Sequence, residues 1–176
     1  MLFDFFNIAA ELKKIPRKGW KEKVGLENPE SVADHSYTSA VIAMVLSDLQ
    51  GRDTQKILKM ALIHDLAESI TGDLTPDEIS KENKMKIENE TMFEIFLELP
   101  QSLSDDYAKI WEEYQEGKSK EAILVHEVDR LEMALQARKY NSEGHPYDKL
   151  KVFFDSARNE IKNKDLLKIL DEISYK

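Results

Sequence analysis

The sequence predicts an all-α protein that forms a single domain over residues 1–176. Apolar residues recur every three or four positions along most of the chain, which is the spacing of an amphipathic helix. The segments with this spacing end at glycine, at proline or at capping residues, as helices do. A chain of 176 residues with 41% hydrophobic and 34% charged residues suits one soluble domain with a sizeable core. No internal repeat, low-complexity segment or long linker divides it.

Start and stop signals define the helices expected in the first half of the chain. The first helix ends before Pro16, because a residue that precedes proline avoids the helical conformation. Ser31 and Asp34 match a capping box, and the helix that starts there stops at Gly51. This helix is apolar on more than one side, so we expect it to be central and buried. A third helix follows directly and stops before Gly72. The expected ranges are 2–14, 31–50 and 54–69.

The second half of the chain predicts five more helices. Thr75 and Glu78 match a second capping box, with Pro76 at the first helical position. Pro100 and Gly117 end two of these helices, because neither residue continues a helix readily. The expected ranges are 77–99, 104–116, 119–141, 147–161 and 164–174.

Composition narrows the classes of function. The net charge of −9 argues against a surface that coats nucleic acid or an anionic membrane, although a local basic pocket could still hold a small anionic substrate. The chain has no cysteine, so any metal must have nitrogen and oxygen ligands. No segment has the pattern of a signal peptide or of a transmembrane span. We therefore expect a cytoplasmic protein that binds neither nucleic acid nor membranes.

Three ionisable residues interrupt the apolar stripe of the predicted helix over residues 54–69. His64 and Asp65 lie side by side where the next core residues should stand, and Glu68 lies one turn beyond His64. Burying such groups is costly unless something pairs with them. A metal ion is the partner that accepts both an imidazole and a carboxylate.

His35 and Asp129 complete a candidate ligand set with His64 and Asp65. The four residues come from three predicted helices, each strongly apolar nearby. Such a set can hold one divalent cation, Mn²⁺, Co²⁺, Mg²⁺, Fe²⁺ or Zn²⁺, and leaves about two positions for water and a substrate oxygen. Glu68 is not needed as a ligand, so it is placed to orient that water or to move its proton. We expect one metal rather than two, because the two remaining histidines, His126 and His145, are weaker candidates for metal ligands.

Two basic regions could contact a phosphate. The turn-rich link of residues 15–20 carries Arg17 and Trp20. An arginine in a loop can bind a phosphate through two donors, and an indole can cover a nucleoside. Lys84 belongs to a basic cluster at the start of the fourth predicted helix, which we interpret as a solvated face, although Lys84 could also supply charge for a phosphate.

These candidates stand within five short motifs. The motifs are Pro16-Arg17-Lys18-Gly19-Trp20, Val32-Ala33-Asp34-His35-Ser36, His64-Asp65-Leu66-Ala67-Glu68, Gly72-Asp73 and Asp129-Arg130-Leu131-Glu132-Met133-Ala134-Leu135-Gln136-Ala137. Through them, the chain resembles the HD-domain superfamily of metal-dependent phosphohydrolases, which is named for an adjacent His-Asp pair. The resemblance is closest to the HD-domain 5′-deoxynucleotidases, and it covers nearly the whole chain.

The resemblance implies an HD-type helical bundle with a metal site between the central helices. It implies that His35, His64, Asp65 and Asp129 hold the metal. Glu68 would be the catalytic acid or base and would act beside the ligand Asp65. The implied reaction releases phosphate from (deoxy)nucleoside 5′-monophosphates.

The same resemblance implies contacts with a nucleotide substrate and with a second copy of the chain. Arg17 would contact the phosphate or sugar, Trp20 would help to close the sugar pocket, and Asp73 would bind the sugar hydroxyl. The resemblance implies no role for His126, which we interpret as a structural residue or as one that supports a metal ligand from outside the ligand set. A homodimer is implied, and surplus aromatic side chains permit it: Phe3, Phe6, Phe153 and Phe154.

Two other functions compete with this one. The first is hydrolysis of a phosphodiester or pyrophosphate ester such as a guanosine alarmone. HD alarmone hydrolases typically carry Glu-Asp after the pair, whereas this chain has Glu68-Ser69. The second is a non-catalytic module that binds nucleotides or dimerises, and the intact ligand set with Glu68 weighs against it.

Overall fold

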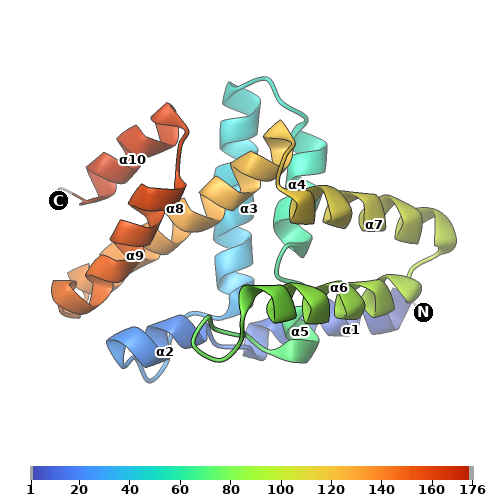
Figure 1. Ribbon diagram of the computed structural model, residues 1–176, viewed down its shortest axis with the longest axis horizontal. Helices are drawn as coiled ribbons and strands as arrows, with labels where there is room; N and C mark the ends of the chain where they lie inside the picture. The colour runs from blue at the N-terminus through green and yellow to red at the C-terminus, as the bar shows by residue number, and fades with distance from the viewer. Residues whose placement is uncertain (1, 175–176) are drawn as a thin grey trace.

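The computed structural model describes residues 2–174, and its regular elements are all helical (Figure 1). The prediction of an all-α fold is therefore confirmed. Within the described residues the backbone forms no β-strand, only an isolated bridge between Pro16 and Ser31. None of the helices in this part of the chain is long and apolar enough to cross a membrane. In chain order the elements are α1 (Leu2–Glu11), the 3₁₀ helix η1 (Leu12–Lys14), α2 (Lys18–Val24), α3 (Val32–Leu49), α4 (Thr54–Ile63), α5 (Glu68–Thr71), α6 (Lys81–Leu97), α7 (Gln101–Glu116), α8 (Lys120–Ser142), α9 (Tyr147–Glu160) and α10 (Lys164–Ser174).

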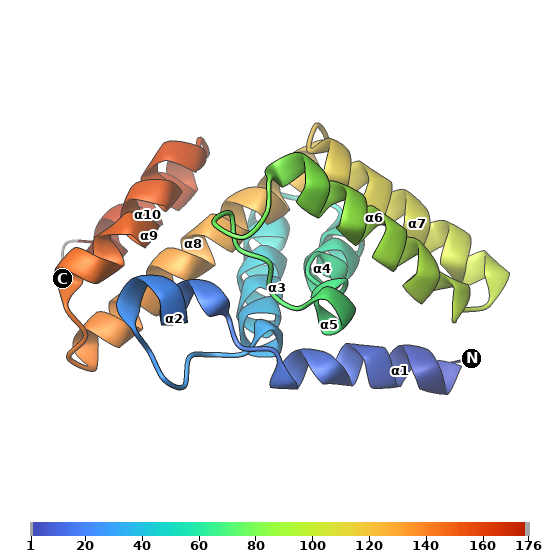
Figure 2. The same cartoon turned by 60° about the horizontal axis from the view of Figure 1, so that its bottom comes forward.

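Helices α3 and α8 cross at the centre of the fold (Figure 1). α9 and α10 pack against α8 on one side, whereas α4 and α7 pack against it on the other. Figure 2 shows α1 running beneath the lower end of α3 and beneath α5. The central place of α8 follows from its sequence, because Val125, Val128 and Leu131 recur at helical spacing and are all buried. α8 therefore brings its polar residues close to α3 and α4.

Helix α3 is central, but it is buried on one face only. Small side chains such as Ser39, Ala40 and Ala43 form much of the buried face, and they let α4 and α8 approach closely. Large apolar side chains on the opposite face are exposed, among them Tyr37 at 70% and Leu49 at 78%. The expectation that this helix is central is therefore confirmed, whereas its burial is limited to the face with small residues, because its neighbours cover only that face.

The helix expected over residues 54–69 is interrupted at His64. α4 ends at Ile63, and α5 begins at Glu68. In the turn between them the backbone N–H of Glu68 donates to the carbonyl oxygen of Asp65 at 3.0 Å. This bond spans three residues rather than four, so the chain winds more tightly here than in an α-helix. A single continuous helix is thus corrected to two helices, with two candidate ligands in the turn that joins them.

Helix α2 lies where the sequence predicts a link. Its first backbone N–H, that of Lys18, donates to Asp73 Oδ2 at 2.7 Å. This bond satisfies one of the donors that a helix start leaves open. Gly25, with a φ of 84°, ends the helix in the left-handed conformation that glycine adopts without strain. The link expected over residues 15–20 is therefore wrong from Lys18 onward, because the acceptor that caps the helix is remote in the sequence.

Helix α6 begins at Lys81 and not at the expected residue 77. Ser80 is its N-cap, and the Ser80 hydroxyl oxygen accepts a backbone N–H of the helix at 3.3 Å. The capping box expected earlier is half formed, since the Glu78 carboxylate accepts the backbone N–H of Thr75 at 3.1 Å. Residues 76–78, where the helix was expected to begin, form only a turn.

Candidate metal centre and active site

Four side chains from three parts of the chain meet in the middle of the fold. His35 is on α3, His64 and Asp65 are in the turn after α4, and Asp129 is on α8. His35 Nε2 lies 3.2 Å from Asp129 Oδ1 and 3.6 Å from Asp65 Oδ2. His64 Nε2 lies 3.2 Å from Asp65 Oδ2. The structure therefore brings together all four residues that the sequence offers as metal ligands.

Hydrogen bonds at the far ring nitrogens fix both imidazoles. His35 Nδ1 lies 2.5 Å from Glu132 Oε2. His64 Nδ1 lies 2.7 Å from the carbonyl oxygen of Ala61. The carbonyl and the carboxylate oxygen accept, so each Nδ1 donates and each Nε2 faces the cluster. Both Nε2 atoms are buried and have no hydrogen-bond partner among residues 2–174, which is unusual unless a further group binds there.

This donor set fits a divalent cation. One ligand atom from each of His35, His64 and Asp129 lies within 4.8 Å of the others, and Asp65 Oδ2 lies beside both imidazoles. Two imidazole nitrogens with carboxylate oxygens suit the first-row divalent metals. The Glu132 bond to His35 is the kind of outer partner that metal-binding histidines have.

The charges of the cluster also call for a cation. Burial lowers the pKa of His35, but the carboxylates of Asp129 and Glu132 outweigh burial and raise that pKa to about 10. Burial raises the pKa of Asp129, yet the Arg130 guanidinium and His35 hold it well below its usual range. Without an ion, His35 therefore keeps a proton at neutral pH, and this proton supplies part of the positive charge that the carboxylates require.

Glu68 lies beside the cluster at the start of α5, and its side chain is only 2% exposed. Burial and the nearby charges of Asp65 and Asp73 raise the pKa of Glu68 well above its usual value. Lys84 Nζ lies 3.3 Å from Glu68 Oε1, whereas Glu68 Oε2 is buried and has no hydrogen-bond partner within the described part of the chain. A carboxyl group with a raised pKa can both accept and donate a proton near neutral pH.

A cavity of about 980 Å³ opens onto these residues. Its volume is in the range of cavities that bind small-molecule ligands. Its walls combine acidic, basic and apolar side chains, so they could contact both a phosphate and a flat organic group. Its lining residues include Asp65, Glu68, Asp73, Glu88 and Asp129, with Arg17, Lys84 and Arg130, and with Trp20, Met133 and Phe153.

Arg17 and Asp73 line the cavity next to the cluster. Arg17 Nη1 lies 3.4 Å from Asp65 Oδ2, so the guanidinium stands beside a candidate metal ligand. Asp73 is buried, and its Oδ2 accepts the first backbone N–H of α2, that of Lys18. The carboxylate of Asp73 thus caps the N-terminus of α2, the helix that begins directly after Arg17.

Trp20 belongs to a packed wall of the cavity and is only 1% exposed. Its ring centroid lies 3.9 Å from that of Phe153, and its Nε1 donates to Glu30 Oε1 at 2.9 Å. Burial and the neighbouring Glu132 raise the pKa of Glu30 to about 7. Because Glu132 also binds His35, the wall around Trp20 connects through side chains to the candidate metal ligands.

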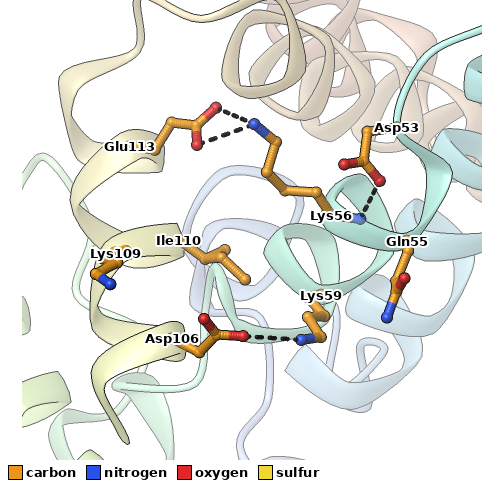
Figure 3. A pocket seen from close by; sticks show the side chains of 8 residues that line it. All are labelled: Asp53, Gln55, Lys56, Lys59, Asp106, Lys109, Ile110 and Glu113. Atoms are coloured by element: carbon orange, nitrogen blue, oxygen red, sulfur yellow. Dashed lines mark hydrogen bonds and ion pairs between the residues drawn. The ribbon is translucent and has the colours of Figure 1, made fainter. Parts of the chain in front are cut away.

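A second hollow, of about 310 Å³, lies between α4 and α7 and is separate from this site (Figure 3). Two of its lysines already have partners: Lys56 Nζ lies 3.0 Å from Glu113 Oε1, and Lys59 Nζ lies 3.6 Å from Asp106 Oδ2. None of the candidate metal ligands is among its lining residues, which are Asp53, Gln55, Lys56, Lys59, Asp106, Lys109, Ile110 and Glu113.

Some residues of the site have no role in the sequence-based interpretation. Glu132 lies three positions after Asp129 and so on the same face of α8, a spacing that could have identified it. Glu30 stands in a loop and carries no comparable signal. The interpretation of Lys84 as part of a solvated face is wrong, because its side chain is 29% exposed and contacts Glu68.

Comparisons with known proteins identify the family. The model of the HD domain family matches residues 9–173. The human 5′-deoxynucleotidase HDDC2 is 37% identical over 173 residues, which cover 98% of this chain and 84% of that protein. The Dictyostelium discoideum protein of the same name is 42% identical over 168 residues, which cover 89% and 88% of the two chains. The crystal structure of the PH0347 protein from Pyrococcus horikoshii OT3 matches with a TM-score of 0.83 and 34% identity over 97% of each chain. The chain therefore belongs to the HD domain family.

Proposed function

We propose that this protein is a phosphoric monoester hydrolase that releases phosphate from deoxynucleoside 5′-monophosphates with one bound divalent cation. The observation that carries the proposal is the cluster of His35, His64, Asp65 and Asp129, which opens to a cavity that also presents Glu68. The human and Dictyostelium relatives are named 5′-deoxynucleotidases, which supports the same substrate class.

In this reaction the bond between phosphorus and the sugar O5′ breaks, and a bond between phosphorus and a water oxygen forms. A divalent ion in the cluster would supply positive charge for the phosphoryl oxygens and would acidify a water molecule. Glu68 takes a proton from the attacking water and returns one to the leaving O5′, so the protein keeps no net proton. The unpartnered Oε2 of Glu68 is the atom available for this transfer.

Arg17 and Asp73 orient the substrate in this proposal. The guanidinium of Arg17 has several donors in one plane, and its contact with Asp65 leaves others for a phosphate oxygen. Asp73 binds Lys18 through Oδ2, so its other oxygen can accept the sugar 3′-hydroxyl. Trp20 and Phe153 then form a flat apolar wall beside the sugar.

Metal binding is expected to release protons and to strengthen as the pH rises. Because the pKa of His35 is raised to about 10, this imidazole is charged at neutral pH and must lose its proton to bind a cation. Below that pKa the proton competes with the ion, so the apparent affinity falls as the pH falls. Burial lowers the pKa of His64, but the neighbouring Asp65 outweighs burial and raises it, so this imidazole also contributes to proton release. Titration calorimetry with Mn²⁺ at pH 7, in two buffers of different ionisation enthalpy, should therefore show at least one proton released per ion.

The matched variants for this titration are His35→Ala and His145→Ala. His35→Ala should lose the ion and the increase in melting temperature that the ion gives, since an ion that binds only the folded state stabilises it. His145 lies outside the cluster, so His145→Ala should keep the bound ion and the increase in melting temperature. Full metal occupancy in His35→Ala, or binding without proton release, would contradict the assignment.

Replacing Glu68 with glutamine should separate binding from chemistry. The amide keeps the shape of the side chain but cannot accept a proton, so kcat should fall by about 10²–10⁴-fold while KM changes little. Metal content, measured by atomic emission on the dialysed protein, should stay at the wild-type level. If the ion is lost together with activity, Glu68 is a metal ligand and the proton-transfer role is wrong.

Deoxynucleoside 5′-monophosphates should be hydrolysed with a higher kcat/KM than the corresponding triphosphates. A triphosphate brings about two more negative charges at neutral pH, and the cavity has more carboxylates than cations in its walls. The 3′-monophosphates should be poor, because their sugar would face away from Asp73. A phosphate-release assay across these substrates measures the order. Preference for triphosphates or for a guanosine alarmone would replace this function with the alternative.

We also propose that the protein forms a homodimer through the exposed face of α3. Tyr37, Val41, Val45 and Leu49 are exposed, and their spacing of four residues aligns them in one apolar stripe. A stripe of this kind on a surface is a common protein interface. The sequence also offers four phenylalanines for a dimer. Phe3 and Phe6 are exposed, whereas Phe153 and Phe154 are buried inside the chain.

Charged substitutions in the stripe should separate the subunits. The double variant Val41→Glu, Val45→Glu should elute as a monomer in size-exclusion chromatography with light scattering, because the interface would bury two unpaired charges. Leu97→Glu is the control, since Leu97 is also exposed but lies on α6. A monomeric wild type, or a dimer lost only in the control, would refute the proposed interface.

A further inference from the structure

Lys84 reaches the site from the first turns of α6. Its Nζ lies 2.9 Å from the carbonyl oxygen of Leu74, 3.3 Å from Glu68 Oε1 and 3.5 Å from Glu88 Oε1. The neighbouring Lys86 differs clearly, because its side chain is 74% exposed and lies 4.0 Å from a carboxylate on the same helix. Lys84 thus belongs to the wall of the cavity and differs from the exposed lysines of the surface.

Hydrogen bonds to Leu74 and Glu68 use two donors of the Lys84 ammonium group, and Glu88 Oε1 lies 3.5 Å from it as an ion-pair partner. An ammonium group has three N–H donors and no acceptor. A substrate oxygen would therefore have to compete with the Glu88 carboxylate for the remaining donor. The geometry therefore argues against a direct contact between Lys84 and the substrate, despite its place in the wall.

Lys84 instead binds only one of the two carboxylate oxygens of Glu68, so the two oxygens have different surroundings. Oε1 contacts the ammonium group, while Oε2 is buried without a partner. A carboxyl group without such an anchor turns freely about its last bond, because rotations of this type have broad minima. With Oε1 held, Oε2 keeps one direction, and this is the oxygen that the proposed reaction uses.

The same ammonium group also holds the loop that carries Asp73. Leu74, whose carbonyl oxygen Lys84 binds, follows Asp73 directly, and Asp73 in turn binds the backbone of Lys18. One cation therefore ties the acid–base residue Glu68 to the loop that faces the substrate.

We propose that Lys84 is a positioning residue for catalysis, one that fixes Glu68 Oε2 for proton transfer through its contacts with Glu68 Oε1 and Leu74. This inference rests on the proposed function, since it assigns a task to the acid–base residue of that reaction. It predicts a specific kinetic signature, because a residue that acts only on the orientation of Glu68 affects turnover more than substrate binding.

The test compares Lys84→Met with the control Lys86→Met in the metal-loaded protein. Lys84→Met should lower kcat by about 10–100-fold and change KM by less than about threefold, with metal content unchanged. Lys84→Arg, which keeps the charge and several donors, should recover part of kcat. In the Glu68→Gln background, Lys84→Met should cost almost nothing more, because the group that it positions is gone. Lys86→Met should match the wild type.

Several outcomes would overturn the inference. A KM raised more than about tenfold with kcat unchanged would mean that Lys84 binds the phosphate directly. Additive losses in the double variant would separate Lys84 from Glu68. A second metal ion in the wild type that disappears in Glu68→Gln would also overturn it, because that ion and not the ammonium group would hold Glu68.

The failure of this inference can be told apart from failure of the proposed function. If the wild type hydrolyses another phosphate ester but no deoxynucleoside 5′-monophosphate, the proposed substrate is wrong, and the Lys84 comparisons are made with that ester. Crystal structures of the metal-loaded wild type and of Lys84→Met give a readout without turnover. One Glu68 conformer in the wild type and a rotated or divided one in the variant would support the inference, and identical Glu68 side chains would refute it.

Discussion

The site depends on holding two imidazoles and two carboxylates together away from water. Ionisable groups are costly to bury, so each needs a partner of its own. Glu132 holds His35, a backbone carbonyl holds His64, and the charge of Arg130 stabilises the ionised form of Asp129. These partners lie on the side away from the shared centre and leave the ligand atoms facing one another. Such a preformed set binds an ion with little rearrangement of the protein.

Several features of the fold follow from this requirement. The small residues on the inner face of α3 let α4 and α8 come close enough for their polar side chains to meet. The tight turn after α4 carries two consecutive candidate ligands, His64 and Asp65, into one centre. α8 supplies both Asp129 and the partner of His35, one turn apart on the same face. The large residues of α3 remain on its outer face, which is why we place the dimer interface there.

Sequence patterns were sufficient for features that depend on local signals. The capping box at Ser31 forms, and the four candidate ligands meet as their spacing on apolar helices suggested. Features that depend on remote partners could not be predicted in this way. The start of α2 is capped by Asp73, and the contact of Lys84 with Glu68 joins two helices across a loop. No local pattern around these residues contains the position of the other partner, so only the folded chain shows them.

The bonds behind Trp20 have a consequence for how this family varies. The indole N–H binds Glu30, whose carboxyl group lies close to Glu132, and Glu132 orients His35. Trp20 therefore cannot change as an isolated pocket residue, because loss of its N–H would remove the donor of one of two crowded carboxyl groups. It would also disturb His35, a candidate metal ligand. Positions 20, 30 and 132 should consequently covary among homologues. Under the proposed function, a natural change in sugar or base preference is then more easily reached through wall residues outside this chain of contacts, such as Met133.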